Sequence, residues 1–119
     1  MQDLTLVIPA KHESESLPIF LKEINQLPCK KIIVLDENDF KTVDAIKKFD
    51  DIEILYQKKI GYGSALIEGI NSVNTTFFCI INADGSMNPS YLFSMWYSCR
   101  AFLFVAMISM IFIKGKFGR

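Results

Sequence analysis

The sequence has few of the features that indicate a disulfide framework, a structural zinc site or a nucleic-acid-binding surface. Its three cysteines, Cys29, Cys79 and Cys99, are widely spaced, and such spacing forms neither a disulfide framework nor a zinc site. The 13 basic residues balance the 13 acidic residues, and no basic stripe favours nucleic acid. We therefore expect reduced thiols in a cytoplasmic protein of one domain at most, with no nucleic-acid partner.

Apolar runs long enough to span a membrane are also missing. Residues 101–113 form an uncharged run of 13 residues, whereas a spanning helix needs about 20. The basic residues within 114–119 would favour peripheral contact with the inner face of a membrane. The run fits a core element, an interfacial segment, or a stretch with no selected role, which would arise if the reading frame shifted near residues 94–100. Residues 1–3 lead directly into a strand pattern, so we expect no signal peptide.

An apolar segment that stops at a small polar cluster is the most informative stretch. Residues 77–81 are β-branched, aromatic or otherwise apolar, which is typical of a strand buried on both faces. Asn82, Asp84 and Ser86 follow it, where open α/β sheets hold their ligands. A carboxylate there can hold a hard divalent cation, which in turn can hold a diphosphate. The alternative is that Asp84 belongs only to a surface turn.

Strand and helix patterns alternate along the chain. Periodicity predicts strands at residues 4–8, 31–35, 52–56 and 77–81. Helical spacing of apolar residues predicts helices between these strands and after Pro89. This alternation indicates a mostly parallel sheet with helices on both faces. The residues that we expect to cap the first three helices are Ser14 or Ser16, Thr42 and Ser64.

Polar or glycine-rich turns follow several strands and suggest one shared site. Gly61 and Gly63 open a helix, and glycines at such a turn let the backbone approach a ligand while the helix N-terminus attracts an anion. Acidic residues follow three of the strands, at Glu13, at residues 36–39 and at Asp84. Each cluster alone is more often a solvated loop. Together they favour a ligand with hydroxyls, a base and a phosphate whose charge a metal offsets.

Four segments together resemble the family-2 glycosyltransferases. Leu6–Glu13 resembles the family's opening V-I-P-A-x-N-E, and Ile33–Asp36 resembles its second strand. Gly61–Leu66 resembles its G-x-G-x-A helix start, and Asn82–Ser86 aligns with its metal-binding Asp-x-Asp segment. The order and spacing match over about residues 4–97, and the nearest branch resembles the dolichol-phosphate mannosyltransferases.

The resemblance implies a Rossmann-like GT-A fold that binds a nucleotide-diphosphate sugar with Mg²⁺ or Mn²⁺. Residues 1–97 would form the nucleotide-sugar-binding domain, and 98–119 would be an apolar tail that is not native to it. The acceptor would be a lipid phosphate or a glycan, as in the synthesis of cell-envelope glycans or polysaccharides. The nucleotide-binding residues would be Pro9, Ala10, Glu13, Asp36, Gly61, Gly63, Asn82 and Ala83. The metal-binding residues would be Asp84 and Ser86.

Several positions depart from the family pattern. Asn82 replaces the first aspartate of the metal motif, and Lys11 and His12 replace the usual Tyr-Asn or Lys-Asn pair. Residues 37–40 lack the family's Gly-Ser turn. In this family the acceptor-binding half and catalytic base follow the metal motif, yet only 33 residues follow Ser86. We therefore expect a truncated chain whose catalytic base is unknown.

Three other functions stay open at this point. The chain could be a nucleotide-sugar-binding fragment that does not catalyse transfer. It could be a membrane-associated remnant whose motifs have lost their role. It could also be a receiver-like domain phosphorylated at its acidic cluster, which would need a lysine at a late strand end.

Overall fold

The computed structural model describes residues 1–83, 90–102 and 111–113. Strands and helices alternate through these residues as the sequence predicts, with one additional short strand near the end. The elements, in chain order, are β1 (Leu4–Pro9), α1 (Ser16–Ile24), β2 (Lys30–Leu35), α2 (Phe40–Ile46), β3 (Glu53–Tyr56), α3 (Tyr62–Asn71), β4 (Phe77–Ile80), α4 (Ser90–Phe102) and β5 (Ile111–Ile113).

The described strands form one sheet in the order β3-β2-β1-β4-β5. The first four are parallel, and β5 pairs antiparallel to β4. The chain winds from β1 outward through β2 to β3, and then returns to add β4 on the other side of β1. This reversal makes a topological switch point at the carboxyl ends of β1 and β4, where open α/β sheets bind their ligands.

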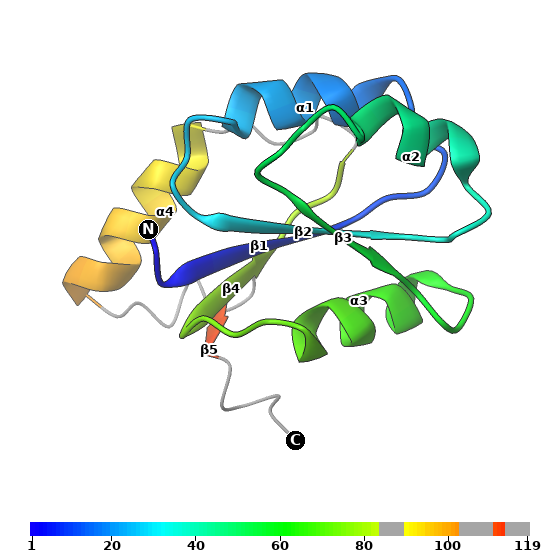
Figure 1. The fold of residues 1–119 in the computed structure, drawn as a ribbon. Coiled ribbons are helices and arrows are strands. Elements are labelled where there is room, and N and C mark those ends of the chain that lie inside the picture. The colour runs from blue at the N-terminus through cyan, green and yellow to red at the C-terminus, as the bar shows by residue number, and fades with distance from the viewer. Residues whose placement is uncertain (84–89, 103–110, 114–119) are drawn as a thin grey trace.

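The helices cover both faces of the sheet, which confirms the α/β fold predicted from the sequence. Figure 1 shows α1 and α2 over one face and α3 under the other. This division follows from the right-handedness of crossover connections. The connections through α1 and α2 move across the sheet from β1 to β2 and β3, whereas the connection through α3 moves back from β3 to β4, so α3 lies on the opposite face.

Alternate residues of the central strands supply two separate cores. In β1, Leu6 and Ile8 pack in the core beneath α1, while Val7 packs in the core with α3. All three side chains have no exposed surface. The sheet is buried on both faces, which is why its strands read as continuous apolar runs rather than as alternating ones.

Helix α3 lies very close to the sheet because a glycine faces it. A Cβ added to Gly69 would come within 2.6 Å of Val7 Cγ1 and 2.9 Å of Val34 Cγ2. Valine side chains are stiff at χ1 and cannot easily turn away. Gly69 therefore sets the distance between α3 and the two central strands.

Helix α1 starts without the serine cap that the sequence suggests. Its N-cap is Glu15, which makes no side-chain capping hydrogen bond, so the prediction for Ser14 or Ser16 is wrong. The Ser16 hydroxyl donates instead to the Glu13 carboxylate. The serine hydroxyl thus bonds to a nearby side chain instead of capping a backbone N–H of the helix.

Helices α2 and α3 also begin earlier than predicted. Their N-caps are Asp39 and Gly61, so Thr42 and Ser64 lie inside the helices and do not cap them. Thr42 is instead fully buried, and its hydroxyl accepts a hydrogen bond from the backbone N–H of Glu13. In both cases the chain turns into the helix sooner than spacing alone indicates.

Helix α4 and β5 extend the fold beyond the segment that carries the family motifs. Leu92, Met95 and Trp96 of α4 join the core that contains α1, and the rings of Phe77 and Trp96 meet edge to face at 5.6 Å and 82°. Helix α4 continues past residue 97, where the sequence suggests a domain boundary, to residue 102. Within the described residues, none of the helices has the length and apolarity needed to cross a membrane.

Candidate functional site

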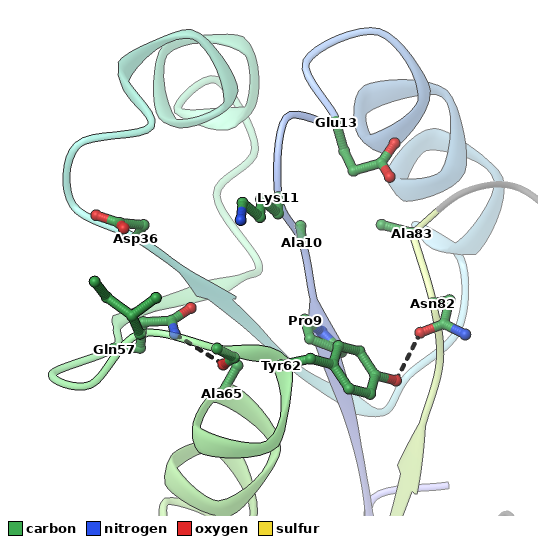
Figure 2. Close-up of a pocket in the computed structure, with 12 residues that line it drawn as sticks. Pro9, Ala10, Lys11, Glu13, Asp36, Gln57, Tyr62, Ala65, Asn82 and Ala83 are labelled. Carbon is green, nitrogen blue, oxygen red and sulfur yellow. Dashed lines mark hydrogen bonds between the residues drawn. The ribbon is translucent and has the colours of Figure 1, made fainter.

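A cavity of about 320 Å³ opens where the parallel strands end. Its walls come from the segments that follow β1, β2, β3 and β4 and from the first turn of α3. Figure 2 shows Glu13 and Ala83 on one side of the cavity and Asp36 and Gln57 on the other. The cavity therefore occupies the switch point of the sheet.

Most of the residues that the sequence singles out for nucleotide binding line this cavity. They are Pro9, Ala10, Glu13, Asp36, Gly61, Asn82 and Ala83. Gly63 is in the first turn of α3 but is not among the described lining residues. Asp84 and Ser86, the predicted metal ligands, lie outside the residues that the structure describes.

Five further lining residues were not predicted from the sequence. They are Lys11, Gln57, Ile60, Tyr62 and Ala65. Four of them lie on the β3–α3 connection or in α3 itself, close to Gly61 and Gly63 in the sequence. Their position beside the glycine turn could have indicated that four of them line the cavity. For Lys11, the corresponding indication was its position between Ala10 and Glu13.

The loop after β1 is fixed by backbone hydrogen bonds to two other elements. The N–H of Ala10 donates to the carbonyl oxygen of Val34 at 3.0 Å. The N–H of His12 donates to Asp39 Oδ2 at 2.8 Å, and that of Glu13 donates to Thr42 Oγ1 at 3.2 Å. The cavity wall formed by residues 10–13 is thus tied to β2 and α2.

Asp39 is a nearly buried carboxylate, since only 6% of its side chain is exposed. Burial by itself raises the pKa of this carboxyl, but the N–H of His12 and the hydroxyl and N–H of Thr42 outweigh that effect and hold the pKa below its ordinary value. The ionised form is therefore favoured in the folded protein. The imidazole Nδ1 of His12 lies 3.8 Å from Asp39 Oδ1, but the ring itself is 77% exposed.

Asp36 closes a tight turn while its side chain faces the cavity. Its Oδ1 accepts from the N–H of Asn38 at 2.9 Å, and its carbonyl oxygen accepts from the N–H of Asp39 at 3.0 Å. Within the part of the chain that is described, its Oδ2 makes no hydrogen bond. One carboxylate oxygen of Asp36 is thus available to a ligand's hydroxyl or N–H groups.

The loop after β3 is shaped by a glycine and by the exposed hydrogen bonds of two side chains. Gly61 has φ 112, a backbone conformation that residues with side chains rarely adopt. The Gln57 amide donates to the carbonyl oxygens of Lys59 and Gly61 at 2.7 and 3.2 Å. Glu68 accepts from the N–H groups of Lys58 and Lys59 at 2.8 and 3.1 Å, and these bonds hold its pKa below the ordinary value.

Tyr62 and Asn82 connect two sides of the cavity. The Tyr62 hydroxyl donates to Asn82 Oδ1 at 2.9 Å, joining the start of α3 to the segment after β4 (Figure 2). This bond could not be predicted from the sequence because the two residues are 20 positions apart. It fixes the orientation of the Asn82 amide.

The described residues do not form a complete metal site. Among residues 1–83 and 90–102, no three side chains of histidine, cysteine, aspartate or glutamate lie together so that they could hold one metal ion. The cavity wall offers two carboxylates, Glu13 and Asp36, and one ammonium, Lys11. These groups suit a ligand that carries hydroxyls and a phosphate.

A second cavity of about 440 Å³ lies between α3 and the end of β3 with the residues that follow it. Leu55, Lys58, Ile67, Glu68 and Asn71 are among the residues that line it. The described residues that the sequence assigns to nucleotide binding are not part of its lining. Among the described strands only β3 contributes to this lining, so strand ends do not converge on it.

Residues 5–105 match the protein family described as Glycosyl transferase family 2. Uncharacterized glycosyltransferases of Mycobacterium bovis and Mycobacterium tuberculosis are 31% identical to the chain over 90 residues. That similarity covers 75% of this chain and 40% of each relative. The chain thus spans less than half the length of the curated relatives it matches.

Two solved structures share the fold. The mannosyl-3-phosphoglycerate synthase from Rubrobacter xylanophilus superposes with a TM-score of 0.63 at 16% identity, over 73% of this chain and 32% of that one. The 4-diphosphocytidyl-2C-methyl-D-erythritol synthase from Anaerococcus prevotii gives a TM-score of 0.68 at 14% identity, over 82% and 50%. From its four ordered motifs, its doubly wound sheet and the match over residues 5–105, the chain belongs to glycosyltransferase family 2.

Proposed function

We propose that this chain binds the nucleotide-diphosphate-sugar donor of a glycosyltransferase in the cavity at the switch point. The observation that supports the proposal is the convergence of four strand ends on one cavity, with Glu13 and Asp36 on its walls. Carboxylates that are held by their own loops suit the hydroxyls of a ribose or the N–H groups of a base. Family membership supports the same class of ligand.

In the proposed reaction an acceptor oxygen, either a hydroxyl of a glycan or a phosphate oxygen of a lipid phosphate, attacks the anomeric carbon of the bound sugar. A new carbon–oxygen bond forms, the bond to the diphosphate breaks, and the nucleoside diphosphate leaves with the electron pair. When the acceptor is a hydroxyl, its proton passes to a base, which we assign to an acceptor-binding part of a longer protein. A bound Mg²⁺ or Mn²⁺ would offset the negative charge that develops on the leaving diphosphate, and Asp84 and Ser86 are its proposed ligands.

We further propose that the acceptor is a lipid phosphate or a glycan, as in the dolichol-phosphate mannosyltransferase-like branch. The reaction would then serve cell-envelope glycan or polysaccharide synthesis at the inner face of a membrane, with the basic residues of 114–119 near that surface. The test is transfer of radiolabelled sugar to lipid-phosphate or oligosaccharide acceptors. A reading of the encoding DNA beyond codon 93 in all three frames tests whether the chain is the truncated product of a longer enzyme.

Nucleotide binding is tested by calorimetric titration of the full chain with nucleoside diphosphates, in Mg²⁺, in Mn²⁺ and in chelator. Binding should weaken roughly tenfold to a hundredfold in Asp36→Asn, because a lost hydrogen bond to a charged group costs about 1.5–3 kcal/mol. Asp50→Asn removes the same charge at an exposed position outside the cavity and is the matched control. Equal affinity in the two variants would refute the assigned site.

A second candidate follows from the chain's coverage of 40% of its relatives' length. The chain would bind the nucleotide sugar without transferring it, and would supply the donor-binding part of an assembly. Binding that depends on Asp84 but yields no transfer with any acceptor favours this function. Transfer by the isolated chain excludes it.

A further inference from the structure

The β1–α1 loop contains a residue in a conformation that needs outside support. His12 has φ 56, in the left-handed region that few residues other than glycine occupy, although asparagine, aspartate and histidine do so more often than the rest. Its ring is largely exposed, so packing of the imidazole does not hold the backbone there. The loop nevertheless carries Lys11 and Glu13, both of which line the cavity.

Two buried groups of the β2–α2 connection supply that support. Asp39 Oδ2 accepts from the N–H of His12 at 2.8 Å, and Thr42 Oγ1 accepts from the N–H of Glu13 at 3.2 Å. Both residues have less than a tenth of their surface exposed. Water competes poorly for such groups, so consecutive N–H groups of the loop are fixed by side chains almost 30 positions away.

Neither supporting residue touches the cavity. Within the described chain, its lining includes residues before and after His12 but not Asp39 or Thr42. These two residues can therefore influence a ligand only through the loop that they hold. Their chemistry suits this task, because each supplies an oxygen acceptor to a backbone donor without adding a side chain to the site.

We propose that Asp39 and Thr42 are positioning residues that hold residues 10–13 in the shape required to bind the nucleotide. The inference rests on the proposed function for its ligand and goes beyond it by assigning the geometry of one wall to residues outside the cavity. These contacts hold the loop in its binding conformation before the donor binds. The free-energy cost of ordering the loop therefore does not weaken donor binding.

The first experiment compares Asp39→Ala with Asp39→Asn in the full chain. Asparagine keeps an oxygen acceptor for the His12 N–H, whereas alanine removes it. In Asp39→Ala, hydrogen exchange of the His12 amide should be at least about tenfold faster, and nucleoside diphosphate affinity should fall by about tenfold. Asp39→Asn should restore most of both, while exchange at Val7 in the core should stay as in the parent chain.

A second pair of variants keeps the proposal testable if Asp39→Ala does not fold. Thr42→Val removes the hydroxyl while keeping the shape, and Thr42→Ser keeps the hydroxyl. Exchange of the Glu13 amide should accelerate in the valine variant alone, together with weaker nucleotide binding.

Two results would overturn the inference. One is unchanged exchange at residues 12 and 13 in Asp39→Ala and Thr42→Val. The other is faster exchange with undiminished nucleotide affinity, which would leave the contacts a purely structural role. Failure of the parent chain to bind any nucleoside diphosphate would instead refute the proposed function, and the exchange data would still decide whether the loop is held by Asp39 and Thr42.

Discussion

The two loops that flank the cavity turn the chain from strand to helix by different means. The loop after β1 uses His12 at φ 56 and is held by Asp39 and Thr42, whose side chains are nearly or fully buried. The loop after β3 uses Gly61 at φ 112 and is held by exposed hydrogen bonds to the side chains of Gln57 and Glu68. One loop depends on buried acceptors, and the other depends on glycine.

This difference indicates where each loop is vulnerable. A buried hydrogen bond is expensive to leave unmade, since the freed donor finds no water. An exposed one exchanges readily with solvent and contributes less. The first loop should therefore be sensitive to its distant partners, and the second to its own backbone residue and to the seating of α3.

The largest effect should come from the glycine that seats α3 on the sheet. Gly69→Ala would press a methyl group against Val7 and Val34, and such overpacking typically costs about 1–3 kcal/mol. Gly63→Ala is the matched control in the same helix, because its Cβ would have no atom within 4 Å. Urea unfolding should show a loss for Gly69→Ala and a neutral or slightly stabilising change for Gly63→Ala; equal losses would contradict the close packing.

The glycine of the second loop should come next. Gly61→Ala forces a side chain onto φ 112, and residues held in such regions cost roughly 1–3 kcal/mol. His12→Gly is the converse change in the first loop and should alter the unfolding free energy by less than about 1 kcal/mol. A similar loss in both variants would mean that the two loops do not differ as described.

Acid should weaken the first loop through Asp39. Because its folded-state pKa is lowered, its contribution to stability is present above the unfolded value of about 3.9 and is lost as the pH falls through the folded-state pKa. The difference in unfolding free energy between the parent chain and Asp39→Asn should therefore shrink as the pH falls through the unfolded value of about 3.9 and on through the folded-state pKa. A difference that stays constant over this range would show that the carboxylate charge does not stabilise the fold.

The smallest effect should come from Glu68, whose hydrogen bonds to the second loop are exposed. Glu68→Gln keeps one oxygen acceptor, so it retains one of the two bonds from the N–H groups of Lys58 and Lys59. The other N–H can bond to water instead, and the charge that is removed is one that solvent screens. Its melting temperature should match that of the parent chain and be insensitive to added salt. A marked loss would place Glu68 with the buried acceptors rather than with the exposed ones.

The sequence predicts the parts of the fold that depend on local pattern. The alternation of apolar strands and amphipathic helices indicates the doubly wound sheet, and the position of Glu13, Asp36 and Asn82 at strand ends predicts that they meet. Local propensity fails where a distant partner competes. Thr42 resembles a cap in the sequence, but in the fold its hydroxyl serves the Glu13 backbone, 29 positions away.

Other features have no local signature. Asp39 reads as one more acidic residue in a polar turn, and only the fold brings it under His12. The bond between Tyr62 and Asn82 likewise depends on how α3 returns to β4. Strand β5 is another such case, because its three residues acquire their role only by pairing beside β4.

The central claim is that a nucleoside diphosphate occupies the cavity at the switch point. The most direct measurement is an NMR titration of the labelled chain with nucleoside diphosphates and Mg²⁺. If the nucleotide binds there, the amide shifts should concentrate at residues lining that cavity, such as Ala10, Gly61 and Asn82. Shifts concentrated at Ile67 and Asn71, which line the second cavity, or no shifts with any nucleotide, would contradict it.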